Sequence, residues 1–147
     1  MSQQEPNERV KLISKMIGMD PKFWPFPIPK NLNAELIEVQ EGYIKYRTVV
    51  QKEWLNPLQI MHGGIMVTLM DEAMGCCGYT LNKEHGFATI NLTADFFSSA
   101  KEGEVIYIYG KIERVGRQMI HATSYIEHEN GKTVAKSTSN LLAYHKS

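Results

Sequence analysis

The stretch of sequence that decides the fold runs from residue 56 to residue 81. It begins Asn56-Pro57-Leu58-Gln59-Ile60-Met61-His62-Gly63-Gly64 and continues Ile65-Met66-Val67-Thr68-Leu69-Met70-Asp71-Glu72-Ala73-Met74-Gly75-Cys76-Cys77-Gly78-Tyr79-Thr80-Leu81. After the glycine pair, apolar or small residues occupy nearly every position for about five helical turns, which is too long for an ordinary strand. The pattern predicts a helix that is apolar on every side and buried in a core.

Asp71 is out of place in this helix. An ionised carboxylate among apolar side chains is costly unless a partner group binds it or a reaction uses it. The neighbouring Glu72 points about 100° away around the helix and can reach solvent. The isolated carboxylate of Asp71 is therefore the first indication of a functional site.

Composition narrows the class of protein. With 147 residues, 43% of them hydrophobic, the chain has room for one domain with a substantial core. Its 16 basic and 16 acidic residues give no net charge, which argues against a partner that is a nucleic acid or an anionic membrane. No charged leader precedes an apolar run, and Asp71 and Glu72 make the long helix a poor membrane span. We expect a soluble, cytoplasmic protein.

The two cysteines, Cys76 and Cys77, are adjacent in the predicted helix. Their side chains diverge there, so a disulfide between them is not expected. Reduced cysteines in a core agree with the expected cytoplasmic location.

Residues 1–32 are expected to form a helix followed by a proline-rich strap, and residues 33–147 to form the main domain. An apolar stripe precedes Gly18 at helical spacing and consists of Val10, Leu12, Ile13, Met16 and Ile17. The following segment, Pro21-Lys22-Phe23-Trp24-Pro25-Phe26-Pro27-Ile28-Pro29, should be extended because of its alternate prolines. Its aromatic rings should then pack over the domain.

Segments with the composition of strands flank the long helix. Residues 34–39 and 43–50 predict a hairpin around Gln40-Glu41-Gly42. Residues 87–97, 105–114, 119–127 and 133–144 predict four more strands, joined by links that favour antiparallel neighbours. The order of hairpin, apolar helix and four-stranded meander predicts an α+β fold in which a curved antiparallel sheet wraps one long helix.

A set of motifs now identifies a family. Asn56, His62-Gly63-Gly64, Asp71, Thr89-Ile90-Asn91-Leu92 and Ser99-Ala100-Lys101-Glu102-Gly103 together resemble the hot-dog-fold acyl-CoA thioesterases, in particular their PaaI-like branch, which includes thioesterase superfamily member 2. The resemblance covers roughly residues 33–144. The fold of that family, a sheet wrapped around a helix, agrees with the fold expected from the residues.

The resemblance implies roles for individual residues. Gly63 matches the glycine whose amide binds the thioester oxygen, and Asp71 matches the catalytic carboxylate, which acts as general base or as nucleophile. Thr89 falls where the family has a hydroxyl that positions the water. Asn56 would lie near the reacting group, and His62 would shape the turn and hydrogen-bond near the thioester.

The chemistry of thioester hydrolysis agrees with the roles implied for these residues. Thioester hydrolysis requires donors for an oxygen that gains negative charge and a group that activates water or attacks the carbonyl. The amides of Gly63 and Gly64 at the start of the helix should be unpaired within it. Gly63 and Asp71 are about 12 Å apart along one helix, so a single chain cannot place both on one carbonyl. A two-fold dimer with antiparallel helices would bring them together. The resemblance also implies that two such dimers form a tetramer.

Coenzyme A would leave its phosphates at the protein surface. Lys101, Arg117 and the adjacent Gln118 are the expected contacts, because charged donors bind phosphate oxygens strongly. The acyl group would need an apolar tunnel, for which Met66, Met70, Met74 and Phe97 are the candidates. No cofactor is expected beyond the coenzyme A of the substrate.

Other chemistries find less support in the sequence. The five histidines lack metal-ligand spacing, and no Gly-x-Ser-x-Gly, phosphate-loop or dinucleotide motif is present. Two alternatives with the same fold stay open: a hydratase or dehydratase, and a non-catalytic acyl-CoA-binding module. An Asp71 carboxylate in the helix favours hydrolysis over both.

Overall fold

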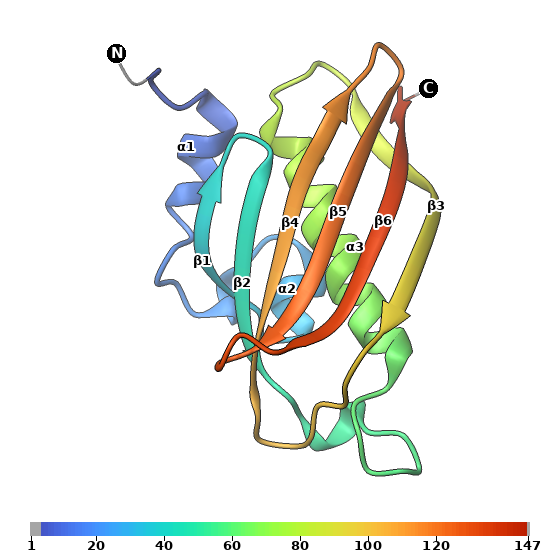
Figure 1. Cartoon of the computed structure of the whole chain (residues 1–147). Coiled ribbons are helices and arrows are strands. Elements are labelled where there is room, and N and C mark those ends of the chain that lie inside the picture. The colour runs from blue at the N-terminus through green and yellow to red at the C-terminus, as the bar shows by residue number, and fades with distance from the viewer. Residues whose placement is uncertain (1–3, 147) are drawn as a thin grey trace.

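The computed structural model describes residues 4–146 and forms one antiparallel sheet curled around a long helix, α3 (Gly63–Thr80) (Figure 1). The strands are β1 (Glu35–Gln40), β2 (Tyr43–Val49), β3 (Gly86–Phe96), β4 (Val105–Val115), β5 (Met119–His128) and β6 (Thr133–Tyr144). The shorter helical elements are α1 (Glu8–Ser14), η1 (Pro21–Phe23), α2 (Pro27–Asn31) and η2 (Lys52–Trp54). The expected α+β fold, with its N-terminal helix and opening hairpin, is confirmed.

The order of strands in the sheet is β1-β2-β4-β5-β6-β3, so the expected four-stranded meander is wrong. β4 pairs with β2, and β3 pairs with β6 at the opposite edge. The link of residues 97–104 makes this possible because it is bonded to both sides of the sheet. At one end the amide of Phe97 donates to Val134, and at the other the amide of Gly103 donates to Val50. β3 is left as an edge strand.

Close packing fixes α3 against the concave face of the sheet. Met70, Ala73, Met74 and Cys77 are completely buried there. Both cysteines are free and buried, as expected. Gly110 of β4 allows the closest approach, because a Cβ at this position would lie 2.8 Å from the carbonyl oxygen of Ala73.

Within the single chain, one side of α3 remains open, so the helix is not buried on every side, contrary to the expectation. Gly64 is exposed, and Thr68, Asp71 and Gly75 are partly exposed on the open side. A Cβ at Gly75 would have no neighbouring atom within 4 Å. Across residues 4–146, no helix combines the length and the apolar character needed to span a membrane.

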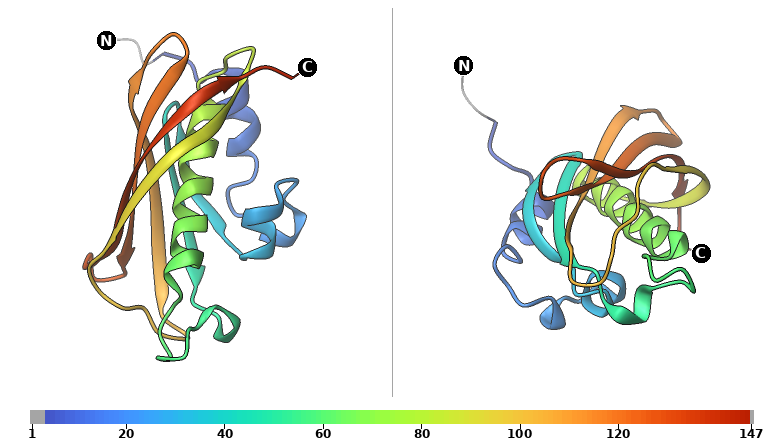
Figure 2. Two further views of the ribbon diagram at one scale, coloured as in Figure 1. Left: turned by 90° about the vertical axis from the view of Figure 1, so that its right-hand side faces the viewer. Right: turned by 60° about the horizontal axis from the view of Figure 1, so that its bottom comes forward.

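The N-terminal segment covers another flank of α3, so that the helix lies between this segment and the sheet (Figure 2). Asn7 connects the two helices: its side chain accepts from the amide of Val10, capping α1, and donates to the carbonyl oxygen of Thr80 at 2.8 Å. Trp24 is buried against Tyr46, and Phe26 meets the ring of Tyr79 edge-on. The aromatic rings therefore pack over the domain as expected.

The backbone of this strap differs from the expectation. Instead of running extended throughout, it forms the short helical turns η1 and α2. Pro21 and Pro27 each occupy the first position of a turn, where the fixed φ of proline suits a helix and no amide hydrogen is needed. The side chain of Asp20 also caps η1 by accepting from the amide of Lys22.

Substitution of Gly110 by alanine tests the contact between helix and sheet. The added methyl group would collide with backbone atoms of Ala73, so we expect Gly110→Ala to lower the free energy of unfolding by about 1–3 kcal/mol in urea titrations. Gly86→Ala is the matched control, because its nearest neighbour would lie at 3.9 Å. Equal stability of the two variants would contradict this packing.

Candidate active site

The hydroxyl group of Thr89 on β3 donates a hydrogen bond to Oδ1 of Asp71 on α3 at 2.8 Å. The two residues are 18 positions apart in the chain, and the pairing of β3 with α3 brings them together. Just after Thr89 the register of β3 against β6 shifts, so the strand bulges beside this contact. Within residues 4–146, the other oxygen of Asp71 has no hydrogen-bond partner, which leaves it open to a water or a substrate.

The sequence suggested that Asp71 is the buried carboxyl group, but the structure buries Glu72 instead. Asp71 is partly exposed on the open side of the helix, whereas burial, with the nearby charge of Asp71, raises the pKa of Glu72 to about 6. Glu72 is close enough to Tyr46 and Cys76 for its charge to act on both. The expectation was reversed because the helix turns Asp71 outward and Glu72 toward β2.

The start of α3 is capped by His62. Its Nδ1 accepts from the amide of Gly64 at 2.9 Å, and its own amide donates to the carbonyl oxygen of Trp54 at 2.7 Å. The amide of Gly64 is thus unpaired within the helix, as expected, and bonds instead to the side chain of the preceding His62. The amide of Gly63 has no acceptor within the described part of the chain, so it is the free donor at the positive end of the helix dipole.

A cavity of about 370 Å³ opens beside Gly63. Its lining comes from the 56–63 loop, the first turn of α3 and the end of β3, and comprises Asn56, Ile60, Met61, Gly63, Met66, Phe96, Phe97, Ser98 and Ser99. Met66 and Phe97 thus lie where a tunnel was expected, but Met70 and Met74 are completely buried core residues. Phe96, which the sequence did not single out, packs so closely that a Cβ on Gly63 would lie 3.1 Å from its ring.

Asn56 lines this cavity while it also closes its own loop. Its Oδ1 accepts from the amide of Leu58 at 2.9 Å and from that of Ile60 at 3.5 Å. The amide of Asn56 in turn donates to the carbonyl oxygen of Ile60. The side chain is therefore held at the edge of the cavity.

The expected phosphate contacts lie at opposite ends of the single chain. Lys101 belongs to the 97–104 link near the start of α3, whereas Arg117 and Gln118 form the turn between β4 and β5 (Figure 1). The backbone amide of Lys101 donates to Glu104. Arg117 and Gln118 border a depression of about 380 Å³ that also includes Arg114, His121 and Asn140, which the sequence did not single out. Alternation along β5 and β6 could have placed His121 and Asn140 on one face.

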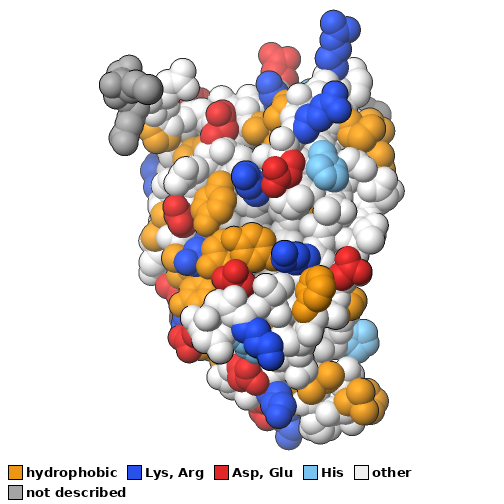
Figure 3. All heavy atoms as spheres, viewed as in Figure 1, with side chains coloured by type: hydrophobic (Ala, Val, Ile, Leu, Met, Phe, Trp, Pro, Cys, Tyr) orange, Lys and Arg blue, Asp and Glu red, His pale blue; other side chains and the backbone are white. Residues whose placement is uncertain are grey.

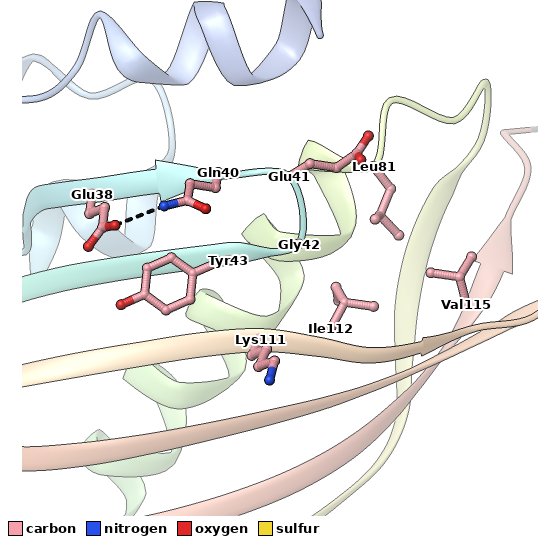
Figure 4. Close-up of a pocket in the computed structure, with 9 residues that line it drawn as sticks. All are labelled: Glu38, Gln40, Glu41, Gly42, Tyr43, Leu81, Lys111, Ile112 and Val115. Carbon is pink, nitrogen blue, oxygen red and sulfur yellow. Dashed lines mark hydrogen bonds between the residues drawn. The ribbon is translucent and has the colours of Figure 1, made fainter. Parts of the chain in front are cut away.

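A second depression, of about 430 Å³, lies at the β1–β2 hairpin (Figure 4). In it, Gln40 donates to Glu38, while the amine of Lys111 points away from both. Neither Asp71 nor Gly63 belongs to this depression. No group of three or more metal-ligating side chains occurs among residues 4–146.

The outer face of the sheet carries hydrophobic side chains between charged ones (Figure 3). Tyr109 and Tyr125 stack there with ring centroids 4.4 Å apart. Lys45 places its amine 4.8 Å from the ring of Tyr107 and 5.1 Å from that of Tyr109. These contacts stabilise the outer face by stacking and cation–π attraction.

The curled sheet, the central helix and the carboxylate on its open side define a hot-dog domain. Residues 58–135 match the family model described as Thioesterase superfamily, and the chain belongs to this family. Membership agrees with the resemblance carried by His62, Gly63 and Asp71 in the sequence.

Relatives of known structure share the fold along most of the chain. The PaaI protein from the phenylacetic acid degradation operon of Escherichia coli is 18% identical, with a TM-score of 0.84 over 97% of this chain and 99% of that chain. A Streptococcus mutans protein bound to acetyl CoA is 23% identical, with a TM-score of 0.74 over 78% of this chain and 90% of that chain. A candidate esterase of Archaeoglobus fulgidus is 29% identical over 106 residues, which are 71% of this chain and 66% of that relative. The match therefore spans just under two thirds of the length of this curated relative.

Glu72→Gln tests the burial of this carboxyl. A pKa raised from 4.5 to about 6 means that the folded state holds the proton more tightly than the unfolded state. The resulting stabilisation is complete below pH 4.5 and is lost as the pH rises through about 6. Glutamine cannot ionise, so the variant should gain about 1–2 kcal/mol in free energy of unfolding at about pH 8.

This gain should shrink toward zero at about pH 3, where the native carboxyl is largely protonated in both states. Glu129→Gln, in the exposed turn after β5, is the matched control and should show no such gain. A gain of equal size at both pH values would indicate a packing effect instead.

Proposed function

We propose that this protein hydrolyses acyl-CoA thioesters to a free acid and coenzyme A. The observation that carries the proposal is the Asp71 carboxylate, bonded to Thr89 and open on its other side, in a chain of the thioesterase superfamily. The structural relative bound to acetyl CoA supports coenzyme A as the carrier of the acyl group.

Hydrolysis needs the carboxylate and the oxygen-binding amide on the same carbonyl. Gly63 supplies the free amide, but it lies about 12 Å from Asp71 along the helix. In our proposal the amide therefore comes from Gly63 of the partner subunit. Two chains related by a two-fold axis then form two equal sites.

The edge strand β3 supports such a dimer. Its outer edge is unpaired in the single chain, and Ile90, Phe96 and Phe97 are each more than half exposed on it or beside it. Unpaired edges are normally covered, paired or charged, because they bind other strands. Antiparallel pairing of β3 with its own copy would also lay the open sides of the two α3 helices side by side in opposite directions. Gly64 and Gly75 on these sides would permit a close approach.

The proposed reaction starts with the thioester oxygen on the free amide, where the helix dipole stabilises the developing negative charge. Asp71 then either takes a proton from a water that attacks the carbonyl carbon or attacks that carbon itself. On the first route the bond between carbon and sulfur breaks, and Asp71 passes the proton it took from water to the departing sulfur, which gives the free acid and the thiol. On the second route the same bond breaks, the departing sulfur takes a proton from solvent, and a mixed anhydride remains on Asp71 until a water hydrolyses it to the free acid. Thr89 keeps the carboxylate in place by donating to Oδ1.

Coenzyme A binding fits the same dimer. Reversal of one chain relative to the other would bring the β4–β5 turn of one chain toward the 97–104 link of its partner. Lys101 and Arg117, which are far apart in one chain, could then act on the phosphates of one coenzyme A. We also propose that two dimers form the expected tetramer.

The two alternative functions differ from hydrolysis in their products. A hydratase or dehydratase changes the acyl chain and leaves the thioester intact, and a binding module changes neither. Thiol release from a panel of acyl-CoA thioesters therefore distinguishes the three. Asp71 favours hydrolysis, because binding alone needs no open carboxylate at this position.

Asp71→Asn tests the carboxylate. The amide has nearly the same shape but cannot accept a proton or attack the carbonyl, so we expect turnover to fall at least about 100-fold in a thiol-release assay. Asp95→Asn, an exposed residue on the same strand as Thr89, is the matched control and should keep native activity. Retained activity in a folded Asp71→Asn dimer would move the catalytic role to another group.

A pair of substitutions at Gly63 tests the amide and its supply by the partner. Proline is well tolerated at the first position of a helix but has no amide hydrogen, whereas alanine keeps the amide and adds a similar Cβ. We expect Gly63→Pro to abolish thiol release and Gly63→Ala to retain more activity.

Mixed dimers of Gly63→Pro and Asp71→Asn chains would contain one intact site each. Random mixing of two inactive chains should then recover about a quarter of native activity. No recovery in mixed dimers of demonstrated composition would show that each site is built from a single chain.

A further inference from the structure

The ring of His128, the last residue of β5, contacts two acceptors at once. Its Nδ1 lies 3.1 Å from Oε2 of Glu104, and its Nε2 lies 3.1 Å from the carbonyl oxygen of Ser99. The side chain is only 15% exposed. Neither a carboxylate nor a carbonyl oxygen can donate, so both ring nitrogens must carry a proton if both hydrogen bonds form. The geometry therefore fits the imidazolium form of His128.

The two acceptors lie at the two ends of one turn, residues 99–104. Glu104 also closes this turn from within: its Oε1 accepts from the amide of Lys101 at 3.0 Å, and its own amide donates to the carbonyl oxygen of Lys101. His128 thus connects both ends of the turn to the end of β5. The turn, the end of β5 and the start of α3 gather at the lower end of the molecule in Figure 1.

The same turn holds the chain that leads into α3. Ala100, completely buried, accepts through its carbonyl oxygen from the amide of Met61 at 2.7 Å. Met61 lies two residues before Gly63, and the intervening His62 is held by Trp54. Ser99, Met61 and Gly63 all line the same cavity. A shift of the 99–104 turn would therefore move the free amide of Gly63.

Several charged groups surround the ring. Glu104 is in direct contact, and Lys101 and Glu102 are exposed on the turn itself. Glu127 and Glu129 are the neighbours of His128 in the chain. The backbone amide of His128 donates to the carbonyl oxygen of Lys132. Among these groups, the carboxylate of Glu104 interacts most strongly with the ring, because it touches Nδ1.

We propose that protonated His128 is a positioning residue that holds Gly63 in place through the 99–104 turn and Met61. Loss of its proton removes one of the two hydrogen bonds, so the turn is held at one end only. The effect on hydrolysis rests on the function proposed above, but the coupling between His128 and the amide of Gly63 does not.

Nuclear magnetic resonance tests this coupling directly. In the native protein, the amide signals of Met61 and Gly63 should shift with the same midpoint as the ring signals of His128 when the pH is varied. In His128→Gln this shift should disappear. In His85→Gln, which removes a histidine at the opposite end of the molecule, it should persist. Amide signals that ignore the ring titration, or that still follow the same curve in His128→Gln, would overturn the proposal.

Kinetics provides the second readout. At about pH 6, His128→Gln should lower kcat about tenfold with little change in KM. A displaced oxygen-binding amide stabilises the transition state less, while it has little effect on how tightly the substrate binds. Native kcat should fall toward that of the variant as the pH rises. A pH profile of His128→Gln that matches the native one would count against the proposal.

Glu104→Gln keeps an acceptor for Lys101, and its amide can also donate to Nδ1 of a neutral ring, so this variant should hold both ends of the turn without the extra proton. Its kcat should therefore no longer fall as the ring loses its proton, a readout that remains if His128→Gln does not fold. A folded Glu104→Gln protein whose kcat keeps the native pH profile would contradict the positioning role. A native protein that releases no thiol from any acyl-CoA would overturn the proposed function alone, because the amide titration is measured without substrate.

Discussion

The close contact between Ala73 of α3 and Gly110 of β4 is the constraint on which the rest of the structure depends. It sets the rotation of the helix about its own axis, because no side chain can be inserted between the two backbones at this point. Once Ala73 faces the sheet, Asp71 must lie on the open side, where Thr89 of the edge strand can reach it. One packing contact thus determines how the helix is rotated and where the candidate catalytic contact between Asp71 and Thr89 can form.

The same rotation separates two adjacent carboxyl groups. Asp71 is accessible and bonded to a hydroxyl group, while Glu72 is partly buried near Tyr46 and Cys76, where its pKa rises to about 6. Neighbouring carboxyls with different surroundings can take different roles. Here Asp71 lies on the open side of α3, whereas the ionised form of Glu72 lowers stability at neutral pH.

Much of this could be predicted from the sequence because it depends on local patterns. The long apolar run gave the extent of α3 to within a residue, and the His62-Gly63-Gly64 motif with Asp71 led to the family. The pairing of the strands could not be predicted from the sequence, because the position of β3 depends on the path of residues 97–104 between β3 and β4. The exposure of Asp71 was missed as well. It depends on the rotation of the helix against the sheet, which periodicity does not reveal.

The pairing of β3 with β6 has a consequence for biosynthesis. Asn91 on β3 bonds to Asn140 on β6, 49 residues later, near the C-terminal end of the described chain. During translation, the helix that carries Asp71 and the strand that carries Thr89 emerge long before the strand that completes their side of the sheet. On the ribosome, β3 therefore lacks its partner strand until β6 has left the exit tunnel. Pairing between segments so far apart in the chain is slow, so the unpaired strand is exposed to aggregation for longer during synthesis.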